Sequence, residues 1–185
     1  TNNLNIKSNI WQPYYVPFID SKSILTIRFV KWTMLNFFKN YDCVIWQDAN
    51  IVQRKDISNL ISLFKKKHLD LMLFRHPYRE NITQELYACS SLKKINYQEL
   101  KKFEDKYLKK YESSNLVETG LMLLNPKSSN LKKTMQEVFF AMRESNIYRD
   151  QLFFPKLLES SRIKYEFINI KNRKKSVRDF GPWIL

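Results

Sequence analysis

The sequence predicts a single α/β domain with a mostly parallel central sheet and helices on both of its faces. Short apolar runs rich in β-branched and aromatic residues alternate along the chain with longer segments of helical periodicity. No internal repeat or interdomain linker interrupts this alternation. At 185 residues, with 44% hydrophobic and 15% aromatic residues, the chain is large and apolar enough to bury one core.

The domain is expected to span residues 1–185, with a basic tail at 171–185. Residues 1–9 are polar and typical of a loop that follows a strand, so the first strand is expected just outside this sequence. Residues 10–18 are aromatic but include two prolines, which predicts only a short or edge strand there.

An amphipathic helix is expected within residues 20–40, where apolar residues recur at three- and four-residue spacing. Arg28 and Lys31 lie three residues apart and therefore on one face of this helix. They can reach a common anion there, or form an ordinary solvent-facing pair.

A strand buried on both faces is predicted at residues 43–46, and polar residues follow it directly. In an extended backbone Asp48 and Asn50 point to the same side, so both can present oxygens to one point. Mg²⁺ and Mn²⁺ take oxygen ligands of this kind and share them with substrate phosphates. The alternative is a turn in which both side chains bond the local backbone.

The remaining elements alternate in the same way. They are a helix at 56–67, a strand at 69–74, a helical stretch at 81–111 broken near 90–96, a strand at 121–126, a helix at 128–144, a helix opening at 149–151 and running to 158, and a strand at 164–170.

Polar side chains stand at four ends of these elements, at 48–50, 76–79, 118–120 and 149–151. Those at 48–50 and 76–79 follow buried strands, and open α/β sheets bind ligands beyond the carboxyl ends of their strands.

The net charge of +14 favours an anionic partner, which could be nucleic acid, an acidic membrane surface or a phosphorylated substrate. Much of the charge sits in lysine runs typical of solvated surface.

The two glycines, Gly120 and Gly181, are too few for a glycine-rich dinucleotide motif or a P-loop. Cys43 and Cys89 lie far apart in apolar settings and are expected to be free thiols. No apolar run is long enough for a transmembrane helix, and no targeting motif is visible.

Two segments resemble a known family. Residues 46–51 read WQDANI and resemble the W-x-D-A-x-I strand end of glycosyltransferase-like domains first described in plant mucilage and cell-wall proteins. The run His76-Pro77-x-Arg79 followed by Glu85 resembles their H-P-x-R-x-x-x-x-E-E segment. Upstream, residues 1–3, Trp11, and the Arg28 and Lys31 pair fall where that family has similar residues, so the match spans roughly residues 1–155.

A more distant resemblance is to glycosyltransferase family 8. Its D-x-D strand end, N-x-G-V-L-L-x-N strand and D-Q-D helix start correspond in order to residues 48–50, 118–125 and 150–152. Here Asn50 replaces the second acid, Glu118 replaces the asparagine, and no histidine follows His76 to act as a third metal ligand. Either His76 or water and phosphate would complete the metal shell, or binding would be independent of metal.

The resemblance implies a Rossmann-like α/β/α domain of the glycosyltransferase A (GT-A) type, acting on a nucleotide-sugar donor with Mn²⁺ or Mg²⁺. It implies Asp48 as a direct metal ligand, and Asn50 as a second ligand or a contact to the donor ribose. The other donor-binding residues expected on this basis are Arg28 and Lys31 at the diphosphate, and His76, Arg79 and Glu118 in the donor and acceptor pocket.

Three residues are expected to carry the transfer itself. Glu85 would hold sugar hydroxyls or the acceptor, Asp150 would orient the acceptor or donor sugar, and Gln151 would lie near the anomeric carbon. The family 8 alignment suggests retention of anomeric configuration.

Two alternatives stay open from the sequence. One is a non-catalytic member of the same fold that binds an acidic glycan or nucleotide. The other is a basic nucleic-acid-binding protein, although no basic helix carries the stacking or base-reading groups such proteins use. The compartment follows from the source: cytoplasm for a bacterial or viral enzyme, and Golgi lumen for a eukaryotic secretory one.

Overall fold

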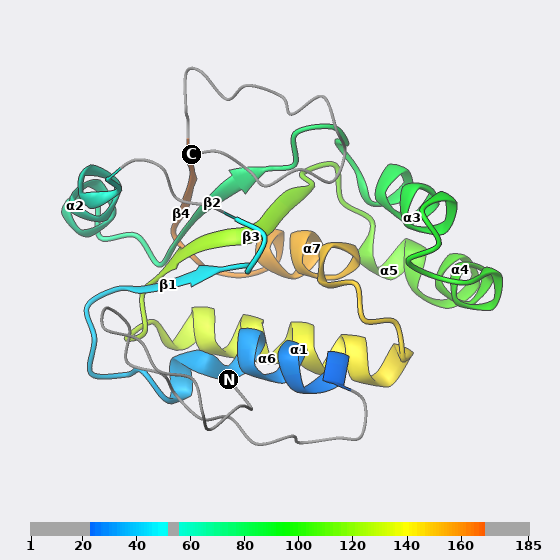
Figure 1. Ribbon diagram of the computed structural model, residues 1–185, viewed down its shortest axis with the longest axis horizontal. Coiled ribbons are helices and arrows are strands. Elements are labelled where there is room, and N and C mark those ends of the chain that lie inside the picture. The colour runs from blue at the N-terminus through cyan, green and yellow to red at the C-terminus, as the bar shows by residue number, and fades with distance from the viewer. Residues whose placement is uncertain (1–22, 52–55, 169–185) are drawn as a thin grey trace.

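The computed structural model describes residues 23–51 and 56–168, which form one α/β domain (Figure 1). The predicted strand at 10–18 and the basic tail at 171–185 lie outside the described residues. Within the described part of the chain, four strands form one sheet in the order β1-β3-β2-β4.

The elements follow the predicted alternation. The strands are β1 (Val44–Gln47), β2 (Leu71–Arg75), β3 (Val117–Leu124) and β4 (Tyr165–Phe167). The helices are α1 (Ser23–Thr33), η1 (Met34–Asn36), α2 (Ser58–Lys66), α3 (Ile82–Ser91), α4 (Tyr97–Phe103), η2 (Glu104–Leu108), α5 (Lys109–Tyr111), α6 (Ser129–Ser145), η3 (Asp150–Leu152) and α7 (Phe154–Glu159). The predicted break near 90–96 is confirmed as the connection between α3 and α4.

The expectation of a mostly parallel sheet is wrong for the described strands. β3 runs antiparallel to both β1 and β2, while β2 and β4 are parallel. The chain leaves β2 at Arg75, passes through α3 to α5, and returns at Val117 directly opposite Arg75. Because it returns at the edge it left, β3 must run in the opposite direction. The start of β3 therefore lies at the same end of the sheet as the C-terminal ends of β1 and β2.

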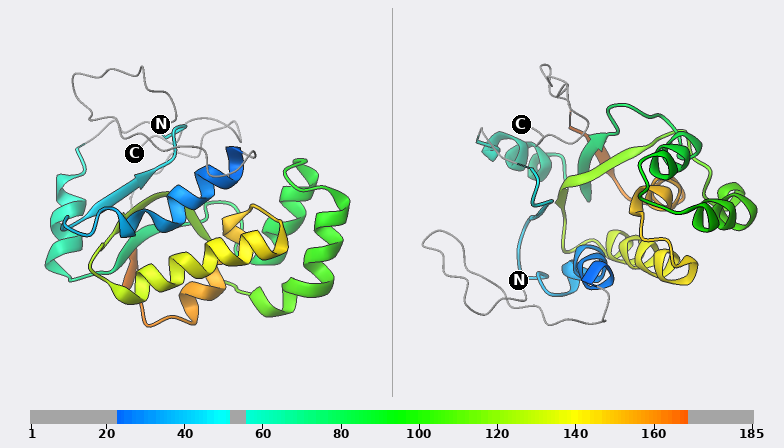
Figure 2. Two further views of the ribbon diagram at one scale, coloured as in Figure 1. Left: turned by 90° about the horizontal axis from the view of Figure 1, so that it is seen from below. Right: turned by 45° about the vertical axis from the view of Figure 1, so that its right-hand side comes forward.

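Helices cover both faces of the sheet, as the sequence predicts. Leu71 and Leu73 of β2 face the larger core cluster, which includes side chains of α1, α6 and α7. Met72 and Phe74 face a second cluster with Phe64 of α2. Figures 1 and 2 show α1 and α6 side by side on one face and α2 on the other. β2 is thus buried on both sides, which explains its unbroken apolar sequence.

The predicted burial of residues 43–46 on both faces is also wrong. β1 is an edge strand among the described strands, and its residues alternate between half-buried and exposed. Val44 and Trp46 pack against the larger core, while Ile45 faces outward and is 37% exposed. Four apolar residues in a row do not distinguish an edge strand from a central one.

Local capping fixes the ends of the helices that flank the site. Asn81 caps α3 by accepting a hydrogen bond from the backbone N–H of Gln84, at 2.9 Å. Ser128 caps α6 in the same way, and α6 ends at Asn146, which adopts the left-handed conformation with φ of 58°. Among the described residues, no helix is both long enough and apolar enough to cross a membrane.

An aromatic cluster under the site gives a test of the core. Phe153 is fully buried, and its ring lies 5.5 Å from that of Phe103 and 4.9 Å from that of Tyr111. Phe153→Ala is expected to lower the free energy of unfolding by about 3–5 kcal/mol, because a large cavity opens in the core. Urea denaturation measures the change. Phe140→Ala is the control, since Phe140 is 58% exposed, and equal losses in the two variants would contradict this packing.

Candidate active site

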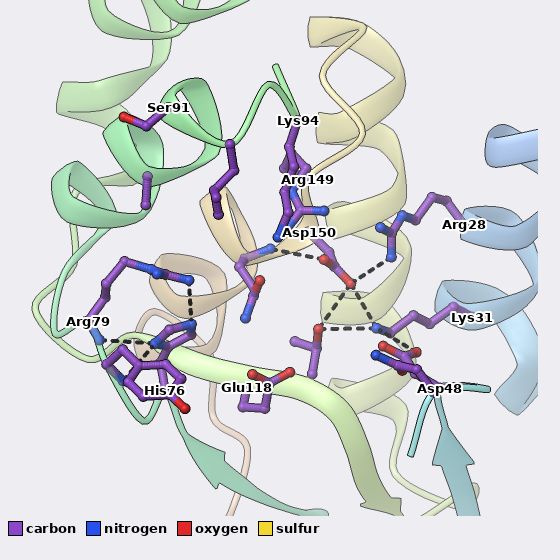
Figure 3. A pocket seen from close by; sticks show the side chains of 16 residues that line it. Arg28, Lys31, Asp48, His76, Arg79, Ser91, Lys94, Glu118, Arg149 and Asp150 are labelled. Atoms are coloured by element: carbon purple, nitrogen blue, oxygen red, sulfur yellow. Dashed lines mark hydrogen bonds and ion pairs between the residues drawn. The ribbon is translucent and has the colours of Figure 1, made fainter. Parts of the chain in front are cut away.

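A cavity of 520 Å³ opens at the edge where β1 and β2 end and β3 begins. Figure 3 shows its lining side chains, which come from α1, the three strand ends, α3 and η3. Nine of the ten predicted site residues line it: Arg28, Lys31, Asp48, Asn50, His76, Arg79, Glu118, Asp150 and Gln151. The polar ends that the sequence singled out therefore meet at one place.

An irregularity in β3 shapes this edge. The register between β2 and β3 shifts between Leu73 and Phe74, so residues 119–121 have no paired residue on β2. Bulged strands bend and redirect their side chains, often beside active sites. Here the side chain of Thr119 is buried at the centre of the polar network, in contact with Lys31 and Asp150.

Asp150, at the start of η3, lies at the centre of a buried ion cluster (Figure 3). Its Oδ2 atom is 2.9 Å from the Lys31 Nζ and 3.2 Å from an Nη1 of Arg28. The Thr119 hydroxyl donates a third hydrogen bond to the same oxygen, at 3.1 Å. Arg28 and Lys31 thus do reach a common anion, and that anion is a side chain of the protein.

Asp150 is held as a carboxylate. Burial alone would raise its pKa, but the positive charges of Lys31, Arg28 and Arg149 together outweigh burial and hold the pKa well below its usual range. With the proton excluded at neutral pH, this side chain can orient hydroxyl groups or stabilise positive charge, and it cannot serve as a proton donor.

Asp48 follows β1, and one of its two carboxylate oxygens is already engaged. The indole N–H of Trp46 donates to Oδ1 at 2.7 Å, and the Lys31 Nζ lies 3.6 Å from the same atom. The backbone N–H of Ile51 donates to the Asp48 carbonyl at 2.9 Å, which forms a turn. The Asp48 carboxylate bonds to the side chain of Trp46, whereas the turn alternative expected it to bond the local backbone. The Asp48 side chain is 39% exposed, and Asn50 is exposed beside it.

Gly120 lies between two carboxylates. A Cβ atom placed there would be 3.1 Å from Oε1 of Glu118 and 3.4 Å from Oδ2 of Asp48. It would also be 2.9 Å from Cδ1 of Ile51, closer than real contacts allow. The absence of a side chain at Gly120 therefore leaves room for both acids at the floor of the cavity.

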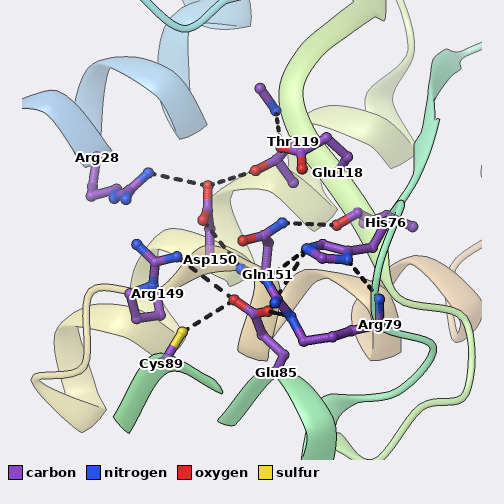
Figure 4. A network of polar contacts seen from close by, with 12 residues as sticks. Arg28, His76, Arg79, Glu85, Cys89, Glu118, Thr119, Arg149, Asp150 and Gln151 are labelled. Atoms are coloured by element: carbon purple, nitrogen blue, oxygen red, sulfur yellow. Dashed lines mark hydrogen bonds and ion pairs between the residues drawn. The ribbon is translucent and has the colours of Figure 1, made fainter. Parts of the chain in front are cut away.

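Glu85 is the one predicted site residue that does not line the cavity. It is 1% exposed, and its two oxygens are divided between two arginines (Figure 4). Oε2 accepts a hydrogen bond from the Arg79 Nε at 2.5 Å, and Oε1 lies 3.7 Å from the Arg149 Nη2. The Cys89 thiol donates to Oε1, and burial raises the pKa of this thiol to about 11. Glu85 therefore holds two cavity-lining cations in place.

His76 is fixed by the turn that follows β2. Its Nδ1 accepts hydrogen bonds from the backbone N–H groups of Tyr78 and Arg79, at 3.3 Å and 3.0 Å. The other ring nitrogen, Nε2, lies 3.0 Å from the Arg79 Nη2 and 3.9 Å from Oε2 of Glu85. Gln151 is fixed as well, because its amide donates to the carbonyl of Val117 at 3.2 Å.

Several lining residues were not predicted. Thr119 and Arg149 lie inside motifs that the sequence singled out, but no role was assigned to them. Ser91 and Lys94, from the end of α3 and the turn after it, gave no sequence signal because they belong to an ordinary polar stretch.

The charges of the cavity are unevenly distributed. Arg28, Arg79, Lys94 and Arg149 line the side formed by helices and loops, whereas Asp48 and Glu118 lie at the strand ends (Figure 3). Counting Lys31 and Asp150, five cationic and three anionic side chains line the cavity, a balance of +2 with histidine neutral. Such a lining favours anionic ligands.

The predicted Mn²⁺ or Mg²⁺ ion would depend on few free oxygens. Oδ1 of Asp48 is engaged, which leaves its Oδ2 and the amide of Asn50 as the predicted donors. Within residues 23–51 and 56–168, no group of three or more His, Cys, Asp or Glu side chains is placed to hold a metal ion. This donor set does not fit a preformed divalent site, and the ion stays a prediction.

No family model matches the sequence, and no curated protein matches it. The structure is similar to the crystal structure of mouse xyloside xylosyltransferase 1 in its apo form, with a TM-score of 0.46 and 14% sequence identity. The match covers 78% of this chain and 51% of that chain, so this chain spans about half the length of the matched protein. At this distance the likeness assigns neither a fold family nor an activity.

The charge of Asp150 gives the first test of the site. Asp150→Asn is expected to lower the free energy of unfolding at neutral pH by about 3–5 kcal/mol, because Lys31 and Arg28 lose their buried counter-ion. The folded-state pKa of Asp150 lies below its ordinary value of 3.8, so its stabilising contribution is present above that value and declines below it.

Urea denaturation of both proteins at neutral pH and near pH 3 checks this prediction. The stability gap between wild type and Asp150→Asn should shrink by about 1 kcal/mol at the lower pH. A gap that stays constant or widens on acidification would show that the pKa of Asp150 is not depressed.

The second test concerns Glu85. Glu85→Gln is expected to lower the free energy of unfolding by about 3 kcal/mol, because Arg79 and Arg149 lose a shared buried partner. Glu80→Gln is a matched control at an exposed position on the same segment and should change stability by less than about 0.5 kcal/mol. Thermal and urea denaturation measure both, and equal effects would refute the role given to Glu85.

Proposed function

We propose that this protein is a glycosyltransferase of the GT-A type that moves a sugar from a nucleotide-sugar donor to a hydroxyl group of a glycan or another acceptor. The observation that carries this proposal is the convergence of nine predicted donor and catalytic residues on one cavity at the strand ends. The cationic lining suits the diphosphate that such a donor carries.

The reaction breaks the bond between the anomeric carbon and the donor diphosphate, and forms a bond from that carbon to the acceptor oxygen. Negative charge develops on the departing diphosphate, and fixed cations lower the free energy of that state. Arg28, Arg79, Lys94 and Arg149 are the cavity-lining cations available for this role. The proton of the acceptor hydroxyl leaves with the nucleotide diphosphate or with solvent.

Asp150 and Gln151 would act at the sugar. The permanent negative charge of Asp150 stabilises positive charge at the anomeric carbon and orients sugar hydroxyls near the cavity wall. The Gln151 amide is held by the Val117 carbonyl, so its position beside Asp150 is fixed. Transfer with retention of configuration is part of the proposal through the resemblance to family 8.

The remaining predicted residues shape the pocket. His76 and Arg79 would line the donor side, and Glu118 would set the charge of the acceptor side. Glu85 would act by orienting Arg79 and Arg149, since its own carboxylate is buried beneath them. Asp48 and Asn50 would stand at the donor ribose and phosphates, and no step of the proposed transfer runs through the predicted Mn²⁺ or Mg²⁺ ion, which the free donors do not fit.

Donor binding by Asp48 gives the direct test of the proposal. In a screen of common nucleotide sugars, at least one should raise the melting temperature of the wild type, because a ligand of the native state stabilises it by mass action. Asp48→Asn should reduce transfer or donor hydrolysis by about a hundredfold or more, because Asp48 loses its charge at the donor site. Product nucleotide release measures the rate.

Asp42→Asn is the matched control for this substitution. Asp42 is exposed and makes only surface ion pairs with Lys65 and Lys127, so its loss should change neither binding nor rate. Binding of a nucleotide sugar without turnover would favour a non-catalytic binding protein of the same fold. Salt-sensitive binding to DNA or RNA, with no nucleotide sugar bound, would instead favour the nucleic-acid alternative.

A further inference from the structure

The side chain of Lys31 is buried to an extent that is unusual for lysine. It extends from the last turn of α1 into the domain and is 1% exposed. Its Nζ lies 2.9 Å from Asp150 Oδ2, 3.1 Å from Thr119 Oγ1 and 3.6 Å from Asp48 Oδ1. An ammonium group has three donors, and here each of the three has an oxygen within reach.

Aromatic rings complete the surroundings of this ammonium group. It lies 5.5 Å from the ring centroid of Trp46 and 5.7 Å from that of Trp32. The indole N–H of Trp46 also donates to the Asp48 oxygen that faces Lys31. A buried ammonium is tolerated only when its charge is compensated, and Asp48, Asp150 and the Trp46 ring provide that compensation.

The position of the Lys31 ammonium group affects where a divalent metal ion could bind. Asp48 and Asp150 come from different elements, and their carboxylates face each other across the ammonium group of Lys31. The location between the two carboxylates, where a cation would be most strongly attracted, is therefore already occupied by the protein. A divalent ion close to Asp48 would also be repelled by Lys31.

We propose that Lys31 is the built-in cation of this site, that it takes the place of a divalent ion between Asp48 and Asp150, and that the nucleotide-diphosphate donor consequently binds without Mn²⁺ or Mg²⁺. Lys31 acts through the two carboxylates, as a positioning residue. The statement about the donor rests on the proposed function, while the statement about the ion does not.

When no divalent ion is bound, other cations of the cavity can bind the diphosphate. Arg28 and Arg149 both line it, and each has a buried Nε–H for which the described residues supply no acceptor. Buried donors in native proteins are normally paired, so an oxygen-rich anion at this wall would supply the acceptors that these two Nε–H groups lack. Arginine also binds phosphate with two parallel hydrogen bonds.

Mn²⁺ binding, followed by electron paramagnetic resonance, tests the ion directly. The wild type should bind no Mn²⁺ at the cavity up to about 1 mM, the range of weak sites. Lys31→Met should gain Mn²⁺ affinity by about tenfold or more, because Asp48 and Asp150 lose their shared cation. Lys31→Arg retains the charge and should exclude Mn²⁺ like the wild type.

Two controls separate this effect from a general change in charge or fold. Lys67→Met removes an exposed lysine that also pairs with a carboxylate, Glu166 at 2.7 Å, and should gain no Mn²⁺ affinity. The double variant Lys31→Met with Asp150→Asn removes the ion pair as a whole and should lose the gained affinity. Circular dichroism identifies variants that fail to fold. If Lys31→Met fails to fold, the Mn²⁺ titrations of the wild type and of Lys31→Arg decide the proposal.

The donor is tested by calorimetry with UDP and GDP, in excess EDTA and in Mn²⁺. The proposal expects one of them to bind with the same affinity, within about threefold, in both conditions. Wild-type Mn²⁺ binding that Asp48→Asn abolishes would overturn the proposal, as would nucleotide binding that requires Mn²⁺. A folded Lys31→Met that gains no Mn²⁺ affinity would overturn the role of Lys31. If no nucleotide binds in either condition, the proposed function fails, and the Mn²⁺ titrations still decide the statement about the ion.

Discussion

The buried contact between Lys31 and Asp150 is the interaction on which the site depends. It joins the end of α1 to the start of η3, and Thr119 of β3 bonds to both partners. Two opposite charges out of water are stable only while their geometry is kept, since either partner alone would be an uncompensated buried charge. The same contact that holds three distant segments together therefore also fixes the electrostatics of the cavity.

The direction of β3 makes this contact possible. Because β3 begins where β1 and β2 end, its first residues, rather than its last, reach the cavity. The bulge directs Thr119 to the ion cluster, and Gly120 leaves space for the carboxylates of Asp48 and Glu118. An unbroken parallel sheet would present different residues at this edge.

Periodicity and motif order were sufficient to predict the elements and the meeting of the polar ends. They did not give the direction of β3, because an apolar run has the same composition whichever way it pairs. They also did not show that the anion shared by Arg28 and Lys31 is Asp150, since Asp150 lies 122 residues after Arg28 in the sequence. The burial of Glu85 beneath Arg79 and Arg149 likewise depends on a contact across the fold rather than on local sequence.

The central claim is that the cavity around Asp150 binds the donor nucleotide sugar, and a crystal structure of the protein with such a donor tests it most directly. The account predicts electron density for the diphosphate against the wall formed by Arg28 and Arg149, with the sugar toward Asp150 and Gln151. Donor density at another surface, with this cavity filled only by water, would contradict it.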